Sequence, residues 1–265
     1  MKGYVYYSRE ESIRNRAFIH DLIDEANKSG IDLQLIVDDE QPDADADFIL
    51  FRDRNPEISA SFERQGFRVF NRSEVNGIAN DKLRTFELAT LLGVPAVPTK
   101  KLRSINDIQS YPVVIKTADG HGGNEVFLCK SAVEAKGFIS KFTNRSLIVQ
   151  PYTESNATDV RVFVIGEKIV GAVKRRGNDS FKSNYILGGS IEKYKMSSWQ
   201  ENEVVRIAKA LKSDYIGIDF LLLTNGRLIL NEIEDPVGAR SLYQTHDFSV
   251  AKKLMDYILI KQNYR

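Results

Sequence analysis

Apolar residues in the first part of the chain form short runs that alternate with a helical pattern. Four compact apolar runs predict strands at residues 4–7, 33–37, 48–51 and 68–70. Between the first two runs, the capping-box spacing of Ser8 and Glu11 and the helical spacing of apolar residues predict a helix that Gly30 ends. A shorter helix is expected near 57–65. The alternation predicts a small parallel sheet covered by helices, in a unit that ends near residue 78.

The rest of the chain is expected to form two further units. A helix at about 81–92, capped by Asn80 or Asp81, leads into the second unit. That unit is expected to contain strands at 113–116, 126–129 and 147–150 and a helix at about 131–141. The third is expected to contain hairpins at 160–173 and 215–231 and helices at about 199–212, with a Ser198–Glu201 capping box, and 248–260. We therefore expect three units, of residues 1–78, 79–152 and 153–265.

The second hairpin of the third unit brings carboxylates together. Its sequence is IGIDFLLLTNGRLILNEIED, and Asn225–Gly226 is typical of a two-residue type I′ turn. The register that follows from this turn places Asp219 directly opposite Glu232. Strand alternation then puts Glu234 on the same face as Glu232.

This arrangement favours a bound metal ion. Directly opposed residues have Cβ atoms only about 4.5–5.5 Å apart, so like charges there repel each other. Hard cations such as Mg²⁺ take oxygen ligands and share them with phosphates. The alternative is a solvated strand end with incidental acids. We expect an apolar, buried face beside the carboxylates, where unpaired charges are unfavourable, formed by Leu221, Leu223, Leu228 and Leu230.

Two lysines and a glycine-rich segment are candidates for phosphate binding. Lys116 ends the apolar strand VVIK and precedes the segment TADGHGGNEV, whose backbone can approach a ligand closely. Lys82 falls in the first turn of its helix, where positive charge opposes the helix dipole. An ordinary glycine turn and a solvated lysine are the alternatives. No Walker A pattern is present, and no HRD or DFG follows VVIK, which excludes a protein kinase.

Basic residues surround the first hairpin of the third unit. Asp159 and Arg161 begin it, and Lys174, Arg175 and Arg176 end it. Arginine is the natural bidentate partner of carboxylate and phosphate, so this stretch indicates a site for phosphate oxygens and an anionic intermediate. An RNA-binding surface is the alternative, but the stretch is short and has few aromatic residues.

Composition narrows the function classes. The 265 residues are 42% hydrophobic and 28% charged, an ordinary globular balance. The net charge of +1 gives no overall attraction to nucleic acid or to an anionic membrane. Cys129 is the single cysteine and follows apolar residues, so we expect a small buried hydrophobe rather than a nucleophile. No secretory signal and no apolar run of about 18 residues is present, so we expect a cytoplasmic protein without a membrane partner.

Taken in order, these pieces resemble the ATP-grasp superfamily, and within it the RimK-like branch of glutamate ligases that modify a ribosomal protein. The likeness covers roughly residues 80–262 and rests on the phrases DVRVFVIGEKIVGAVKRR, FKSN, GGS, GIDFLL and LNEIE. It implies an α/β (α+β) ATP-grasp fold. Residues 1–78 are similar to the small parallel α/β domain that usually precedes the ATP-grasp core.

The resemblance also implies roles for matching residues. Lys82 and Lys116 are similar to the two lysines that contact ATP phosphates, and Asp159 to the acid that binds the ribose. The full nucleotide-binding set that it implies is Lys82, Lys116, Gln150, Pro151, Tyr152, Asp159, Lys182, Ser183 and Asn184, with 150–152 at the adenine. The groups that it implies around the γ-phosphate and the acyl-phosphate are Arg161, Arg176 and Asn184. The metal ligands that it implies are Asp219, Glu232 and Glu234.

Three departures from the family pattern stand out. Family members usually carry Asn where this chain has Glu234, which adds a negative charge to the metal site. The glycine-rich segment is irregular at His121–Glu125. Downstream, Asp235–Arg240 replaces the common SPG-type loop, and Arg240 is a candidate to meet a substrate carboxylate.

The expected function is therefore ATP-dependent ligation of a carboxylate to an amine, through an acyl-phosphate, with release of ADP and phosphate. The implied cofactors are ATP and one or two Mg²⁺ ions, which Mn²⁺ can replace. The partners are a small-molecule or peptide carboxylate and an amine acceptor, an amino acid among the candidates, and relatives often self-associate into homo-oligomers. The alternatives are an ATP-binding sensor without ligase turnover and a Mg²⁺-dependent nuclease, which the two lysines disfavour.

Overall fold

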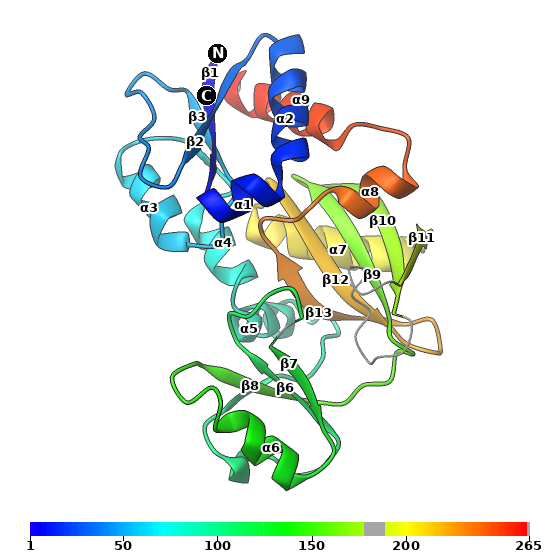
Figure 1. Cartoon of the computed structure of the whole chain (residues 1–265). Helices are drawn as coiled ribbons and strands as arrows, with labels where there is room; N and C mark the ends of the chain where they lie inside the picture. Colours follow the sequence, from blue (N-terminus) through cyan, green and yellow to red (C-terminus); the bar gives the residue numbers. More distant parts are fainter. Residues whose placement is uncertain (124, 178–188, 264–265) are drawn as a thin grey trace.

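Three β-sheets follow one another along the chain (Figure 1). The computed structural model describes residues 1–123, 125–177 and 189–263. The first sheet is parallel, as predicted, in the order β2–β1–β3–β4. Its strands are β1 (Lys2–Tyr7), β2 (Asp32–Val37), β3 (Phe48–Phe51) and β4 (Val69–Phe70).

Helices cover both faces of the first sheet. They are α2 (Arg16–Lys28) on one face and α3 (Pro56–Arg64) on the other. The short helix α1 (Arg9–Arg14) precedes α2, and α4 (Ser73–Ala79), which was not predicted, packs its Val75 and Ala79 into the core of the third sheet. The helix expected up to Gly30 is divided at Asn15, whose side-chain amide and backbone N–H both donate to the carbonyl of Glu11. Ser8 precedes α1 but makes no side-chain cap, so the capping-box prediction there was wrong.

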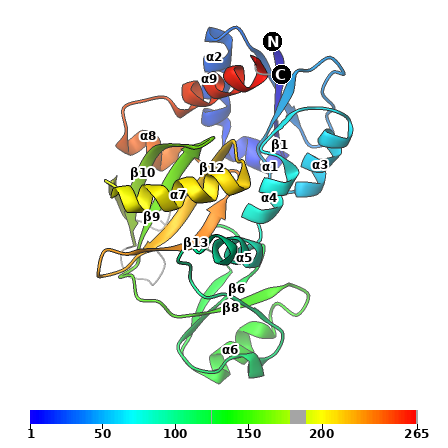
Figure 2. The same cartoon turned by 180° about the vertical axis from the view of Figure 1, so that it is seen from behind.

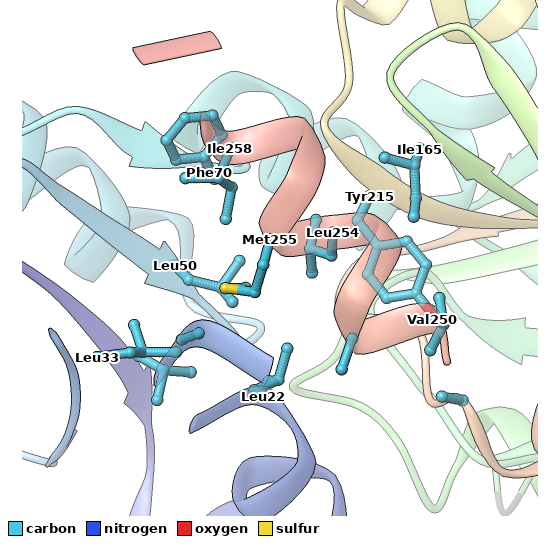
Figure 3. Packing of buried hydrophobic residues seen from close by; sticks show 14 of the residues in the cluster. Leu22, Leu33, Leu50, Phe70, Ile165, Tyr215, Val250, Leu254, Met255 and Ile258 are labelled. Atoms are coloured by element: carbon cyan, nitrogen blue, oxygen red, sulfur yellow. The ribbon is translucent and has the colours of Figure 1, made fainter. Parts of the chain in front are cut away.

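The last helix, α9 (Val250–Asn263), packs on this first sheet (Figure 3). Met255 lies beside Leu50 of β3, while Leu254 lies beside Tyr215 of the third sheet. One buried cluster therefore joins the first and third sheets, and both chain ends lie at the same end of the molecule (Figure 1).

The second sheet is antiparallel, in the order β5–β8–β6–β7. Its strands are β5 (Lys100–Leu102), β6 (Val113–Thr117), β7 (Val126–Cys129) and β8 (Leu147–Pro151). The helix α6 (Ala132–Ile139) packs on one face, and Cys129 is buried in that core as predicted. The helix α5 (Lys82–Leu92) precedes this sheet, and Asp81 caps it by accepting from two backbone N–H groups.

The third sheet has the order β11–β10–β9–β12–β13. Its strands are β9 (Thr158–Ile165), β10 (Lys168–Arg176), β11 (Ser190–Lys193), β12 (Tyr215–Leu222) and β13 (Leu228–Glu234). The helix α7 (Ser198–Leu211) lies across one face (Figure 2). Its capping box is formed by Ser197 and Gln200, one residue before the predicted pair. A short helix, α8 (Arg240–Thr245), follows β13 and was not predicted.

The linker after α5 attaches the second sheet to the third. The backbone N–H of Leu230 donates to Pro95, and the N–H of Val97 donates to Leu230, so the linker runs as a short parallel bridge along the edge of β13. No helix in the described part of the chain is long and apolar enough to cross a membrane.

Candidate functional site

The carboxylate hairpin has the predicted pairing but not the predicted turn. Asp219 lies opposite Glu232, as expected. The turn is a three-residue loop rather than a type I′ turn, because Leu223 pairs with Arg227 and Gly226 takes a φ of +80°. That loop shifts the register by one residue, and a β-bulge at Asn231 shifts it back before Asp219 is reached.

The bulge also changes which side chains face the site. Leu228 and Leu230 belong to the core under α7, on the face opposite the carboxylates, so the prediction that they share the carboxylate face was wrong. The extra residue of the bulge, Asn231, lets Leu230 and Ile233 both point into that core while Glu232 and Glu234 point away from it.

Three carboxylates meet on the face of the sheet away from α7. Asp219, Glu232 and Glu234 each offer an oxygen, and these oxygens lie within 4.8 Å of one another. Asp219 is buried, whereas Glu232 and Glu234 are partly exposed. Hard oxygen donors at this spacing fit a divalent cation such as Mg²⁺.

Two arginines from neighbouring strands hold Asp219. Arg161 of β9 donates from Nε to Oδ1 (2.7 Å) and from Nη2 to Oδ2 (2.6 Å), and the same Nη2 also contacts Glu234 Oε1. Arg175 of β10 donates to Asp219 Oδ2 (2.7 Å). Burial alone would raise the pKa of Asp219, but the two guanidinium groups lower it to about 2. Burial, assisted by Asp219 and Glu232, raises the pKa of Glu234 even though Arg161 opposes the shift.

Arg175, rather than Arg176, reaches the carboxylates. Residues alternate across a strand, so the two neighbours point to opposite faces of β10. Arg175 is buried and contacts Asp219, whereas Arg176 is exposed and lines a small hollow with Lys174 and Thr158 on the other face. The sequence placed both at the end of the hairpin, and the register with β9 decides which of them faces inward.

The two predicted lysines converge on β13 from the second sheet and from α5. Lys82 Nζ donates to the carbonyl of Gly120 in the glycine-rich segment and lies 3.5 Å from Glu232 Oε2. Lys116 Nζ donates to Asn231 Oδ1 at 3.0 Å. Both lysines are buried. Burial, reinforced by repulsion from Lys82, lowers the pKa of Lys116 to about 8, although Glu232 opposes the shift.

Besides Arg175, Asn231 is a site residue that sequence reasoning missed. It lies next to Glu232 in the phrase LNEIE and accepts from Lys116. A bulge delivers it to the site face, and no local pattern distinguishes a bulge residue from an ordinary strand residue.

The remaining predicted nucleotide residues fall into three groups. Asp159 is buried, and Arg175 donates to both of its oxygens at 2.6 and 2.8 Å. Gln150 is buried and donates to Thr99, while Pro151 is exposed and Tyr152 is half-buried where the chain leaves the second sheet. Lys182, Ser183 and Asn184 lie outside the described residues.

Polar side chains from residues 52–76 hold the loop that follows β13. The Asp235 carboxylate accepts from Asn71 and Asn76, both at 3.0 Å, and the carbonyl of Val237 accepts from the buried Arg52 at 2.6 Å. Burial raises the pKa of Asp235 to about 6. Arg240, the candidate for a substrate carboxylate, is exposed at the start of α8.

Cavity size does not identify this site. An open hollow of about 820 Å³ lies along the first residues of β10, lined by Val170, Lys195, His246 and Phe248 among others. None of the predicted site residues that the structure describes lines it. The carboxylates and lysines are therefore recognised by their charges and mutual contacts rather than by a cavity.

Comparison with known sequences identifies the family. The model of the RimK-like ATP-grasp domain matches residues 87–258. A probable alpha-L-glutamate ligase of Picosynechococcus is 32% identical over 212 residues, which cover 76% of this chain and 70% of that protein. The uncharacterized protein MG011 of Mycoplasma genitalium is 29% identical over 97% of this chain and 92% of its own length.

Solved structures share the fold over nearly the whole chain. The D-cycloserine synthetase DcsG has a TM-score of 0.78 at 17% identity, and the match covers 99% of this chain and 100% of that protein. D-alanine–D-alanine ligase from Bacillus anthracis, complexed with ATP, has a TM-score of 0.76 at 15% identity, and the match covers 100% of this chain and 98% of that protein. The ATP-grasp ligase PsnB, complexed with a precursor variant, Mg and ADP, has a TM-score of 0.74 at 14% identity, with 98% of both chains covered.

The family model spans more than half of the chain, and the predicted ATP-grasp fold is confirmed over all three sheets. The chain therefore belongs to the RimK-like ATP-grasp family and is an ATP-dependent ligase.

Proposed function

We propose that this ligase joins a carboxylate to an amine through an acyl-phosphate and releases ADP and phosphate. The observation that carries the proposal is the meeting of three carboxylates of β12 and β13 with two buried lysines, one of α5 and one of β6. Carboxylates suit the metal that accompanies ATP, and lysines suit its phosphates. The ligase names of the sequence relatives support the same reaction class.

The basic residues of the site would bind phosphate groups, and the acidic residues would bind the metal. Lys82 and Lys116 bind phosphate oxygens of ATP, and Arg161 faces the phosphoryl group that is transferred. Asp219, Glu232 and Glu234 would hold Mg²⁺, which when bound neutralises charge on the phosphates. Arg175 keeps Asp159 and Asp219 in place through its contacts to both.

The bond changes are simple. An oxygen of the substrate carboxylate attacks the γ-phosphorus, the bond to the β-phosphate oxygen breaks, and ADP leaves. The amine nitrogen then attacks the acyl carbon, the carbon–oxygen bond to phosphate breaks, and the amine proton is released to solvent. No side chain forms a covalent intermediate.

For the substrates, we propose an amino acid as one partner, on the strength of relatives named as glutamate ligases. The other partner is a small molecule or a peptide. We further propose that residues 1–78, 79–152 and 153–265 are the three functional units, with the site where the second and third meet.

The test is ADP release across a panel of carboxylates and amines, with ATP and Mg²⁺ present. Release that requires both partners supports the ligase. ATP binding without stimulated turnover would favour the rival sensor, and release with neither partner would contradict both. Asp219→Ala and Glu232→Ala should abolish release while the circular dichroism spectrum is unchanged; release at the wild-type rate would overturn the metal assignment.

A further inference from the structure

Arg161 bridges two of the three carboxylates that make up the metal site. Its Nη2 contacts both Asp219 Oδ2 and Glu234 Oε1, and its Nε contacts Asp219 Oδ1. The guanidinium therefore lies between ligand oxygens that themselves lie within 4.8 Å of one another.

The contacts to Asp219 leave little room for another cation. A carboxylate has about four lone-pair positions, and three donors already use those of Asp219, two from Arg161 and one from Arg175. Arg175 also binds Asp159 through both Nε and Nη2 and is anchored outside the carboxylate cluster. Arg161 is the arginine that stands between Asp219 and Glu234.

Among the residues that the structure describes, the positive and negative charges around the carboxylates are equal in number. Four carboxylates, Asp159, Asp219, Glu232 and Glu234, lie among four cationic side chains. Lys82, Arg161 and Arg175 pair with carboxylates, while Lys116 contacts the neutral Asn231 beside Glu232. A divalent cation added to a neutral site meets four nearby positive groups, and like charges repel most strongly where water is excluded. A nucleotide triphosphate brings the negative charge that these groups need.

We propose that Arg161 is the counter-ion that a divalent cation displaces, so that this protein binds the metal tightly only together with a nucleoside triphosphate. The phosphates of the nucleotide then bind the Arg161 guanidinium, which has moved away from Asp219 and Glu234. This inference rests on the proposed nucleotide site, and it assigns Arg161 a positioning role in addition to its role at the phosphoryl group.

The test is Mn²⁺ binding measured by electron paramagnetic resonance, with no reaction taking place. Wild-type protein should bind Mn²⁺ weakly alone and at least tenfold more tightly with a non-hydrolysable ATP analogue. Arg161→Met should bind Mn²⁺ alone at least tenfold more tightly than wild type, because three carboxylates lose a cation. The analogue should then improve Mn²⁺ binding less than it does in wild type.

The matched control is Arg227→Met, which removes an exposed arginine from the tip of the β12–β13 hairpin and should leave both Mn²⁺ affinities unchanged. If Arg161→Met does not fold, Mn²⁺ binding by Arg161→Lys tests the proposal instead, because one ammonium cannot bind both carboxylates as a guanidinium does. Arg161→Lys should bind Mn²⁺ alone more tightly than wild type. Equal or weaker binding of Mn²⁺ alone by the folded Arg161 variant overturns the proposal. Loss of ligase activity across the substrate panel, with the Mn²⁺ pattern intact, would instead refute the proposed reaction.

Discussion

Replacing Lys116 with Met should make the protein more stable and unable to hold ATP. Lys116 is buried, with 7% of its surface exposed, and its ammonium donates a hydrogen bond to the neutral side chain of Asn231. Burial lowers its pKa from 10.5 to about 8. The folded state therefore carries an ammonium that it disfavours, a feature expected of a binding group rather than of a structural one.

The size of the effect follows from linkage. Each pKa unit corresponds to about 1.4 kcal/mol, so the charged Lys116 destabilises the fold by about 3 kcal/mol at neutral pH. Its pKa is lower in the folded than in the unfolded chain, so the unfolded chain binds more protons between pH 8 and 10.5. Wild-type stability should thus rise over this range relative to Lys116→Met, and the advantage of the variant should vanish near pH 10.5.

Urea denaturation of both proteins at several pH values between 7 and 10.5 measures this difference. The control is Lys101→Met, which removes an exposed lysine of β5 and should leave stability unchanged. In parallel, the melting temperature should rise with an ATP analogue for wild type and for Lys101→Met, but not for Lys116→Met. A Lys116→Met protein that is less stable than wild type at pH 7, or that the analogue still stabilises, would refute the reasoning.

Three further substitutions test the surroundings of the site. Glu234→Asn removes one negative charge and keeps an oxygen ligand, so ADP release should persist but need a severalfold higher Mg²⁺ concentration, measured by titration; unchanged Mg²⁺ dependence would contradict this. Gly217→Ala would bring its new methyl group within 2.5 Å of Val237 Cγ2 and should destabilise the protein by about 1–3 kcal/mol in urea, whereas wild-type stability would show that the loop yields freely. Burial raises the pKa of Asp214 to about 6 despite its hydrogen bond from Tyr257, so wild-type stability falls as pH rises from about 4 to 6. Asp214→Asn should therefore be more stable by up to about 3 kcal/mol at pH 7 and equal to wild type below pH 4; equal stability at both pH values would count against the shift.

The sequence predicted the elements that have strong local signals. The strands of the first sheet, the cap of α5 at Asn80 or Asp81, and the hairpin of β9 and β10 follow from apolar period, capping residues and turn residues. Elements without such a signal were missed, as α4, β5, β11 and α8 show. The packing of α9 on the first sheet joins residues some two hundred positions apart, and no local pattern carries that information.

The site was predicted by residue type better than by orientation. The structure brings together Lys82, Lys116, Arg161 and the three carboxylates. The predicted pairing of Asp219 with Glu232 is correct only because the longer loop and the bulge at Asn231 shift the register by one residue in opposite directions. The choice between Arg175 and Arg176 likewise depends on strand register, which a single sequence does not determine at a hairpin end. Charge and motif therefore indicate which residues take part, while register decides which of them face the site.

The linker after α5 joins the second sheet to the strand that carries Glu232 and Glu234. Pro95 and Val97 bond to both backbone groups of Leu230, the residue immediately before Asn231. Asn231 is in turn the partner of Lys116 in the second sheet. The two lysines thus come from one side of this bridge, and the carboxylates and the two arginines come from the other. The bulge at Asn231 then has two effects in one residue, since it restores the register that aligns Glu232 with Asp219 and supplies the oxygen that receives Lys116.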